Sequence, residues 1–246
     1  MKDSIKILGI KINNVDIKNA VDYAIDSVET DSQADMIVTP NSEMIVMAQK
    51  DKHLAKIIND SYLSIPDGAG VLLASRVVNT PLKGRVAGYD LMKQLLTVSA
   101  EKKYKVYLLG GEQKVIAEAK KKAEKLYPGI KICGYHHGYL NKELKEKVFN
   151  EINQLSPDIL FVGMGVPLQE KFLYKNLSNL NVKLAITVGG AFDVLSGRAN
   201  RAPLWMQKIH LEWFFRLLQE PGRFIRMTAL PYFAYLVFKE KLGGKR

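Results

Sequence analysis

The sequence has few of the residues that build disulfide frameworks and metal sites. Among its 246 residues are one cysteine, Cys133, and four histidines that do not cluster. A single cysteine excludes an internal disulfide, and the scattered histidines give no zinc-type ligand set. This composition is typical of a protein from a reducing compartment and argues against a structural metal.

Three phosphate-binding signatures are also missing. The glycines at 110–111 and 163–165 lack the third glycine of the dinucleotide fingerprint, which counts against an oxidoreductase. No Gly-Lys-Ser/Thr phosphate loop occurs, which counts against an NTPase. No Asp-x-Asp pair is present to chelate a metal-bound sugar nucleotide. We therefore expect no metal and no cofactor. The negative charge of a bound diphosphate would have to be compensated by backbone amides, helix dipoles and arginines.

Long hydrophobic runs are absent at both ends of the chain. Residues 1–6 are charged and then strand-like, without an apolar signal segment, so export is not expected. The apolar run at 227–238 has about twelve residues and contains Pro231. A helix that spans a bilayer needs about 20 residues, so this run is too short.

What the sequence does contain is a regular alternation of strand and helix patterns, with 47% hydrophobic and 25% charged residues. Apolar runs predict strands at 8–10, 35–39, 62–65, 105–109, 130–133, 159–162 and 184–188. Helical spacing appears at 15–28, 44–48, 54–58, 91–100, 113–127, 142–154 and 169–176. This order predicts an α/β fold with a Rossmann-like, mostly parallel sheet flanked by helices, in one domain covering residues 1–196.

Several predicted strands end in polar residues or glycine, and the ends of parallel strands share one edge of a sheet. The most important of these residues is Asp67, in the Pro-Asp-Gly sequence after the strand at 62–65. Thr39 and Asn41 are at the end of the strand at 35–39, which is expected to lie nearby. Arg85 belongs to a basic, glycine-containing stretch that could lie beside Asp67. The alternative for Asp67 is a turn with an Asx cap, and Thr39 and Asn41 alternatively cap a helix. Arg85 alternatively forms a surface ion pair.

Paired glycines follow two other strands, at Gly110-Gly111 and Gly189-Gly190. Glycine at a strand end lets a diphosphate approach backbone amides at the start of the next helix, although glycine also simply turns the chain. Asp193 follows the second pair, and Gln169 begins the helix after 163–167. Both are candidates for ligand contact or for helix N-terminal positions.

The last fifty residues form a basic and aromatic appendage. Residues 197–246 hold ten Lys+Arg against three Asp+Glu and both tryptophans. Apolar residues recur at helical spacing from 204 to 218, and the run at 227–238 is expected to be interrupted by Pro231. Such a segment favours an anionic membrane surface, with a helical pair completing the core or a dimer as the alternative. No nucleic-acid-reading motif accompanies the charge.

Motifs along nearly the whole chain are 39–41 (TPN), 66–70 (PDGAG), 85–90 (RVAGYD), 108–111 (LLGG), 157–170 (PDILFVGMGVPLQE), 188–193 (VGGAFD), 201–203 (RAP), 212–213 (EW), 216–221 (RLLQEP) and Arg223. Together they resemble the WecG/TagA/CpsF family of bacterial glycosyltransferases. The branch that looks closest implies inverting transfer of N-acetylmannosamine from its UDP donor to the 4-hydroxyl of undecaprenyl-diphosphate-linked N-acetylglucosamine, in wall teichoic acid synthesis. The resemblance also implies a cytoplasmic protein, peripherally bound to the inner membrane face, whose appendage docks on the membrane and helps to close the site.

On this hypothesis Asp67 is the base for the acceptor hydroxyl. The other expected roles are substrate binding for Thr39, Asn41, Arg85 and Gln169, nucleotide binding for Gly110, Gly111, Gly189, Gly190 and Asp193, and lipid-diphosphate or membrane contact for Arg216, Arg223 and Arg226. Transfer of another sugar (N-acetylmannosaminuronate or glucose) within the same family, or a non-catalytic membrane-surface protein, are the competing functions. Self-association into a homo-oligomer is left open.

Overall fold

The structure is a computed structural model that describes residues 2–30, 33–209, 211–219, 222 and 228–243, with only the backbone at 216. The strands are β1 Ser4–Ile7, β2 Ile10–Asn13, β3 Asp35–Val38, β4 Leu63–Ser64, β5 Lys105–Gly110, β6 Lys131–His136, β7 Ile159–Gly163 and β8 Leu184–Thr187. The helices are α1 Ile17–Glu29, α2 Ser42–Lys50, α3 Lys52–Asp60, α4 Ala69–Val77, α5 Gly88–Lys102, α6 Gln113–Leu126, α7 Lys142–Leu155, α8 Leu168–Asn176, the 3-10 turn η1 Leu177–Asn179, α9 Ala191–Ser196, α10 Leu204–Lys208, α11 Glu212–Gln219 and α13 Ala229–Gly243.

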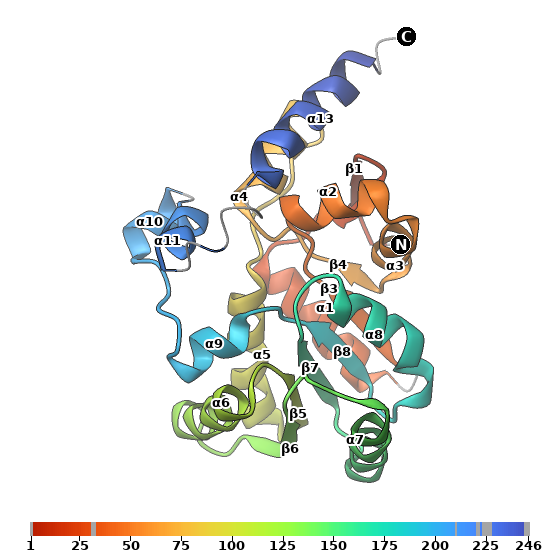
Figure 1. Ribbon diagram of the computed structural model, residues 1–246, viewed down its shortest axis with the longest axis vertical. Coiled ribbons are helices and arrows are strands. Elements are labelled where there is room, and N and C mark those ends of the chain that lie inside the picture. The colour runs from red at the N-terminus through yellow and green to blue at the C-terminus, as the bar shows by residue number, and fades with distance from the viewer. Residues whose placement is uncertain (1, 31–32, 210, 220–221, 223–227, 244–246) are drawn as a thin grey trace.

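Six strands form one sheet in the order β4-β3-β8-β7-β5-β6 (Figure 1). Every pair is parallel, with Ile37 opposite Ile186 between β3 and β8, and Leu108 opposite Phe161 between β5 and β7. The predicted parallel sheet is confirmed. Because all the strands run the same way, their carboxyl ends lie along a single edge, which is where the candidate site residues gather.

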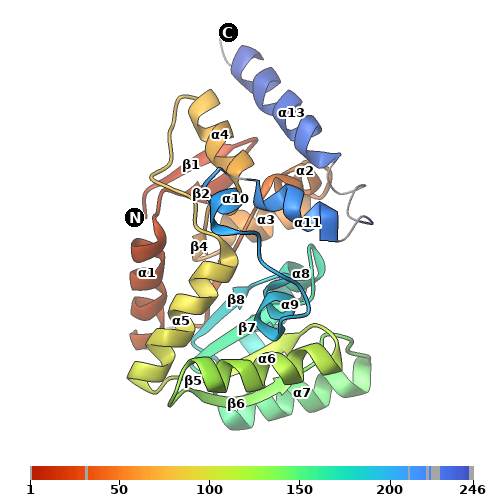
Figure 2. The same ribbon diagram turned by 90° about the vertical axis from the view of Figure 1, so that its left-hand side faces the viewer.

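Helices cover both faces of the sheet (Figure 2), and alternate strand residues feed the two cores. In β5, Val106 and Leu108 pack with α1, α5, α6 and α9, while Tyr107 and Leu109 pack with α2, α3, α4, α7 and α8. All four residues are fully buried. A sheet covered on both faces requires continuous apolar strands, which explains why these runs show no polar alternation.

The first predicted strand, at residues 8–10, is wrong. Leu8 and Gly9 form the turn of a β1–β2 hairpin with φ of 52° and 76°, and Ile7 pairs with Ile10. Turns of two residues with positive φ match the twist of antiparallel strands. The hairpin side chains Ile7, Ile10 and Ile12 are buried, so it closes one end of the second core.

Three other elements differ from expectation. The helix α4 was not predicted, because its start at Ala69-Gly70 reads as part of a glycine loop; Gly70 lies so close to Ser42 that a Cβ there would be 2.2 Å from Ser42 Oγ. Strand β6 continues through His136, three residues beyond the predicted end of that strand at residue 133. Pro231 lies in the first turn of α13, where its missing N–H costs no helical hydrogen bond, so it does not interrupt the helix.

The expected continuous helical segment at 204–218 is two helices, since α10 ends at Lys208 and α11 begins at Glu212. Beyond them, α13 packs against α2 and α4 and projects past the body of the protein (Figure 1). Phe233 and Val237 are buried in the second core, and the Leu8 N–H donates to Glu240 Oε2 at 3.1 Å. The carboxyl-terminal segment therefore contributes to the core as well as to the surface.

Candidate functional site at the carboxyl edge of the sheet

Asp67 lies in the loop after β4, and backbone hydrogen bonds hold this loop to its neighbours. The Asp67 N–H donates to the Pro40 carbonyl at 3.2 Å, and the Val86 N–H donates to the Pro66 carbonyl at 3.0 Å. Gly68 has φ of 93°, a conformation that favours glycine, and it is the N-cap of α4. Three chain segments distant in sequence thus meet around one carboxylate.

The Asp67 carboxylate is partly buried and faces positive partners. Its Oδ2 accepts from the Gly88 N–H, the first residue of α5, at 3.4 Å, and its Oδ1 is 3.8 Å from Arg85 Nη2. The side chains of Asp67 and Arg85 are 25% and 19% exposed. A helix N-terminus and a guanidinium both attract negative charge. The expectation that Arg85 lies beside Asp67 is confirmed.

Thr39 and Asn41 both hold the backbone at this edge. The Thr39 hydroxyl donates to the Thr187 carbonyl at 3.3 Å and so joins the ends of β3 and β8. Asn41 is the N-cap of α2, with Oδ1 accepting from the Met44 N–H at 2.9 Å. The capping alternative for Asn41 is therefore confirmed. The proposed contacts of both residues with a sugar remain predictions.

Arg85 has its shortest contact with the appendage. Its Nη2 donates to Glu212 Oε2, in α11, at 2.7 Å, and the Glu212 side chain is 8% exposed. Arg201 Nε lies 3.5 Å from the other Glu212 oxygen, while its two Nη atoms bind both oxygens of Asp90 at 2.6 Å. Acidic and positively charged side chains thus alternate in the order Asp67, Arg85, Glu212, Arg201 and Asp90. This network connects the first turn of α5 to α11.

Gln169 and Glu170 lie in the first turn of α8 and are 1% and 0% exposed. Gln169 Oε1 accepts from the Gly189 N–H at 3.1 Å, and its Nε2 donates to Glu170 Oε1 at 2.7 Å. Burial raises the pKa of Glu170 to about 7, although hydrogen bonding to Gln169 and proximity to the Thr187 hydroxyl oppose the rise. The Gln169 amide is thus engaged inside the protein, and its predicted contact with substrate remains a prediction.

The glycines at the ends of β5, β7 and β8 pack backbone against backbone. A Cβ at Gly110 would lie 2.2 Å from the Gly163 carbonyl oxygen, and one at Gly163 would lie 2.7 Å from that of Gly189. The Gly111 N–H donates to the Gly163 carbonyl at 2.9 Å. A Cβ at Gly189 itself would meet no described atom within 4 Å. Glycine is therefore required at Gly110 and Gly163 for close packing of the strand ends.

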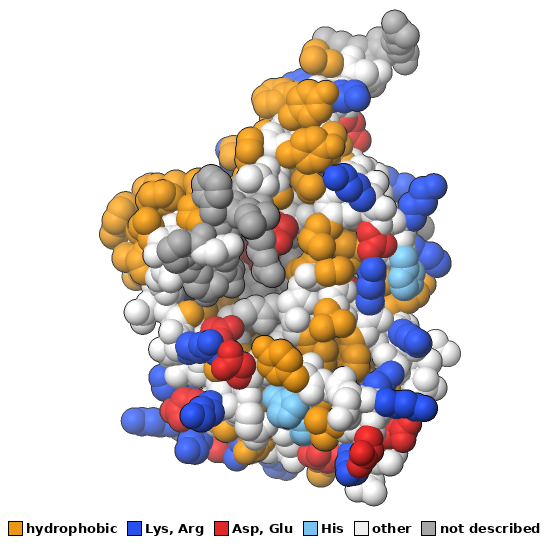
Figure 3. Space-filling model, viewed as in Figure 1, with side chains coloured by type: hydrophobic (Ala, Val, Ile, Leu, Met, Phe, Trp, Pro, Cys, Tyr) orange, Lys and Arg blue, Asp and Glu red, His pale blue; other side chains and the backbone are white. Residues whose placement is uncertain are grey.

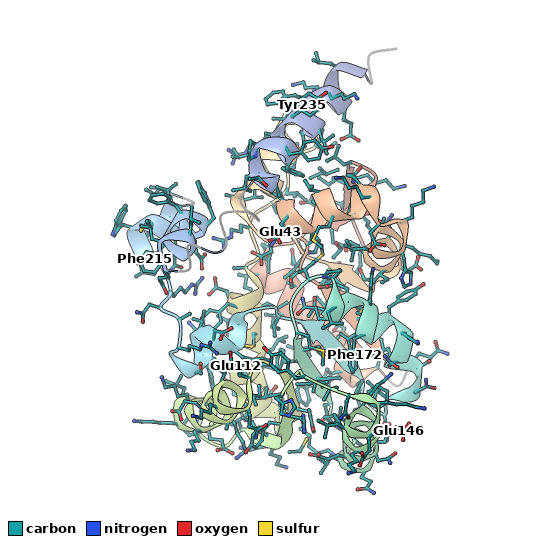
Figure 4. All side chains as sticks on the ribbon, viewed as in Figure 1. Glu43, Glu112, Glu146, Phe172, Phe215 and Tyr235 are labelled. Carbon is teal, nitrogen blue, oxygen red and sulfur yellow. The ribbon has the colours of Figure 1, made fainter. Side chains whose placement is uncertain are left out.

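Asp193 lies in α9, and Arg198 links it to the Gly110-Gly111 loop. Arg198 Nη1 binds Glu112 at 2.7 Å, and its Nε is 4.0 Å from Asp193 Oδ1. Figure 4 labels Glu112, which lies where α6 and α9 meet. The two glycine pairs predicted to bind nucleotide lie at the carboxyl ends of β5 and β8, on either side of β7, and Asp193 lies in the helix after the second pair, so all of them are at the same edge of the sheet.

Sequence reasoning missed several residues of this edge, namely Glu170, Thr187, Arg198, Arg201 and Glu212. Glu170, Arg201 and Glu212 fall within the motifs of the family resemblance, so a signal for them existed. Arg223 and Arg226 lie outside the described residues, and for Arg216 only the backbone, in α11, is described. Their predicted contacts with a lipid diphosphate or membrane stay predictions.

A separate pocket of about 540 Å³ lies at the opposite edge of the sheet. Its lining includes Asp35 at the start of β3, Tyr62 just before β4, and Val182 shortly before β8. Ligands of parallel α/β sheets bind at the carboxyl ends of strands, and the chemically equipped side chains of this protein lie at those ends. We therefore place the candidate site there and not in this pocket.

Fold and site together define a parallel α/β protein whose candidate ligand site is at the carboxyl edge of the sheet, where a carboxylate, an arginine and glycine loops are arranged. The chain belongs to the glycosyl transferase WecG/TagA/CpsF family, whose model matches residues 5–246. The family resemblance found in the sequence is therefore confirmed.

Relatives of this chain carry a more specific name. It is 40% identical over 210 residues to the N-acetylglucosaminyldiphosphoundecaprenol N-acetyl-beta-D-mannosaminyltransferase of Bacillus subtilis strain 168, covering 85% of this chain and 81% of the relative. It is 32% identical over 243 residues to the protein of the same name from Staphylococcus aureus strain MW2, covering 98% and 95% of the two chains.

Proposed function

We propose that this glycosyltransferase moves N-acetylmannosamine from UDP-N-acetylmannosamine to the 4-hydroxyl of undecaprenyl-diphosphate-linked N-acetylglucosamine, with inversion. The names of the relatives give the sugar and the lipid acceptor. The observation that carries the proposal is the position of Asp67, a partly exposed carboxylate at the carboxyl edge of the sheet with Arg85 beside it. A base and a diphosphate-binding cation are what a single displacement of UDP needs.

In the proposed step, the 4-hydroxyl oxygen of the acceptor forms a bond to the anomeric carbon of the donor sugar, and its proton passes to the Asp67 carboxylate. The bond between that carbon and the UDP oxygen breaks, and its electron pair leaves on the diphosphate. Arg85 and the amides of the Gly110-Gly111 and Gly189-Gly190 loops stabilise the developing negative charge. Asp193 accepts hydrogen bonds from the ribose hydroxyls, while Thr39, Asn41 and Gln169 bind the sugars directly or through the backbone they hold.

The appendage is proposed to dock on the anionic inner face of the cell membrane. No helix in the described ranges up to residue 243 is long and apolar enough to cross a membrane. Large apolar side chains nevertheless remain exposed on α10, α11 and α13, as the space-filling view shows at its upper left and top (Figure 3). They are Leu204, Trp205, Ile209, Trp213, Phe214 and Leu218, which we call the α10–α11 apolar face, together with Tyr232, Tyr235, Phe238 and Leu242 of α13.

Closure of the site by the appendage is supported by the buried contact between Arg85 and Glu212. An exposed ion pair contributes little, but a charge that is 8% exposed is costly to leave unpaired. The pair therefore favours the arrangement in which α11 lies against the site. The same helix carries Arg216, which, with Arg223 and Arg226, we propose for the acceptor diphosphate.

The test is release of UDP from UDP-N-acetylmannosamine by purified protein, with and without the lipid-linked acceptor, comparing the wild type with Asp67→Asn. Loss of a general base costs about 10²- to 10⁴-fold. We expect release that depends on acceptor and falls by at least about 100-fold in the variant. The exposed α1 residue Asp22 supplies the control, Asp22→Asn, which should match the wild type.

Release that is equal in the wild type and Asp67→Asn would remove Asp67 as the base. If UDP-N-acetylmannosamine gives no release, UDP-glucose and UDP-N-acetylmannosaminuronate test transfer of another sugar. Failure of all three donors would favour a non-catalytic membrane-surface protein.

A further inference from the structure

Glu170 is a completely buried carboxyl group beside the proposed donor site. It is 0% exposed, and no ion pair joins it to a described lysine or arginine. Its Oε1 accepts from Gln169 Nε2 at 2.7 Å, while its Oε2 has no hydrogen-bond partner among the described residues. A buried acid without a counter-ion is costly in its charged form.

The neighbouring Gln169 amide has an orientation that both of its partners select. Its Oε1 accepts from the Gly189 N–H at 3.1 Å, and its Nε2 donates to Glu170 at 2.7 Å. Rotating the amide by 180° would set Nε2 against the Gly189 N–H, where two donors meet, and Oε1 against Glu170 Oε1, which accepts in the observed arrangement. The Gly189 N–H and the accepting oxygen of Glu170 together therefore favour the observed orientation of the Gln169 amide.

We propose that Glu170 is a positioning residue that fixes the Gln169 amide and, through it, the Gly189-Gly190 turn. Gly189 has φ of 52° and follows the carboxyl end of β8. The inference rests on the proposed function only in assigning this turn to the donor diphosphate. Glu170 and Gln169 are 0% and 1% exposed, so both act on the turn through its backbone amide.

A neutral Glu170 can fill this role, because a carboxyl group that carries its proton on Oε2 still accepts through Oε1. Burial raises the pKa of Glu170 to about 7, so a large fraction carries a proton near neutral pH. The Thr187 hydroxyl, which also lacks a hydrogen-bond partner among the described residues, is the polar group close to the carboxyl. The titratable groups on the elements packed against α8 are Lys52, His53, Lys56 and Asp60 of α3 and Asp35 of β3, and α8 itself carries Lys171, Tyr174 and Lys175. The groups that shift the pKa of Glu170 include none of them.

Three variants separate this role from simple packing. Glu170→Gln keeps a neutral acceptor, Glu170→Met keeps similar volume without one, and Gln169→Met removes the linking amide. The readouts are hydrogen exchange of the Gly189 amide and the dissociation constant for UDP by calorimetry. A hydrogen bond contributes about 1 kcal/mol, or roughly fivefold. We expect Glu170→Met to speed exchange at Gly189 and to weaken UDP binding by about three- to tenfold, with Glu170→Gln close to wild type.

The double variant Gln169→Met/Glu170→Met should show the same exchange rate at Gly189 and the same dissociation constant for UDP as Gln169→Met alone, because Glu170 acts only through Gln169. Glu146→Met, at an exposed position of α7, is the control (Figure 4). Unchanged exchange at Gly189 in Glu170→Met, or additive effects in the double variant, would overturn the proposal.

Two further measurements keep the proposal testable. If Glu170→Met does not fold, the Gln169 side-chain and Gly189 amide resonances of the wild type should titrate together near pH 7 and stay constant in Glu170→Gln; absence of this titration contradicts the proposal. If exchange at Gly189 responds as expected but UDP does not bind any of the folded proteins, the positioning role stands and the proposed function fails.

Discussion

At the scale of single residues, the charge on Arg85 is divided between two acids. Its Nη2 is 2.7 Å from Glu212 and 3.8 Å from Asp67. An arginine held by a buried carboxylate is already fixed in position before a diphosphate arrives, so less side-chain freedom is lost on binding. Arg85 is therefore suited to stabilise a developing charge without closing tightly on the base.

Two substitutions of Arg85 should distinguish the effect of its positive charge from the effect of its planar guanidinium geometry. We expect Arg85→Gln to lower the transfer rate by about 10- to 100-fold because it removes a charge-assisted contact, and Arg85→Lys to recover only part of the loss. Steady-state rates with saturating acceptor provide the measurement. Arg76→Gln, at an exposed position in the last turn of α4, is the matched control. Full activity in Arg85→Gln would exclude Arg85 from the diphosphate site.

Glu170 should make the protein less stable as the pH rises. Its pKa is about 7 in the folded state against an ordinary value of 4.5, so the folded state binds more protons between these values. The stabilising contribution is complete below about pH 4.5 and disappears as the pH passes 7, a loss on the order of 3 kcal/mol. Denaturant unfolding at pH 5 and pH 8.5 should show that Glu170→Gln removes most of this dependence. An identical pH dependence in both proteins would contradict the assignment.

At the scale of elements, α11 has two distinct faces. One presents the buried Glu212 to Arg85 and Arg201, and the other exposes Trp213, Phe214 and Leu218. The helix is therefore placed to link the proposed membrane surface with the site. The aromatic residues Phe215 of α11 and Tyr235 of α13 are labelled in Figure 4.

Neutralising Glu212 should weaken the contact between α11 and the candidate site while leaving the α10–α11 apolar face unchanged. We expect Glu212→Gln to reduce transfer by about tenfold or more, because Arg85 and Arg201 lose a buried counter-charge, while flotation with liposomes is unchanged. Glu240→Gln, in α13, retains an acceptor for the Leu8 N–H and is the control. Parallel loss of flotation and transfer would mean that Glu212 stabilises the appendage as a whole.

The α10–α11 apolar face should be the part of the appendage that docks. We expect Trp205→Ser/Ile209→Ser to reduce flotation with anionic liposomes by about tenfold or more, since each buried large side chain contributes about 1.5–3 kcal/mol. Added salt should weaken docking of the wild type. Leu126→Ser, also an exposed leucine but in α6, is the control. Equal flotation of the double variant and the wild type would remove this face from the docking surface.

At the scale of the whole molecule, residues on both sides of the predicted domain boundary at residue 196 contribute to the same hydrophobic core. Phe233 and Val237 of α13 are 3% and 2% exposed and pack in the second core with α2 and α4. The predicted domains, 1–196 and 197–246, are thus joined by buried apolar contacts and by the Arg85–Glu212 pair. The appendage remains a separate element in sequence and in proposed function.

Removing the appendage should therefore cost stability as well as docking. A chain ending at residue 206 should fold and lose flotation and most transfer, but its free energy of unfolding should be lower by about 3–6 kcal/mol because two buried side chains are lost. Denaturant unfolding measures this difference. A chain ending at residue 228 retains α10, α11 and the Arg85–Glu212 pair, so it should show only the destabilisation that comes from losing Phe233 and Val237. Unchanged stability in both chains would mean that α13 does not pack on the body.

Much of the fold could be predicted from local patterns. The buried strands β3, β5, β7 and β8 are short apolar runs that end in polar residues or glycine, and α6 and α7 have clear helical periodicity. The hairpin turn at Leu8-Gly9 and the helix α4 were not predicted, because glycine at 9, 68 and 70 is compatible with strands, turns and helix starts alike. Local sequence does not distinguish among these uses when long-range packing decides.

For the site, the sequence by itself determined the kinds of residue and the edge at which they collect: Asp67, Thr39 and the glycine pairs follow strands, and parallel strands end together. Only the tertiary structure decided the partners. It brought Glu212 to Arg85 across 127 positions, paired Arg201 with Asp90, and buried Glu170 behind Gln169. Periodicity records which face of an element is apolar, whereas ion pairs and pKa shifts depend on distances between elements far apart in the chain.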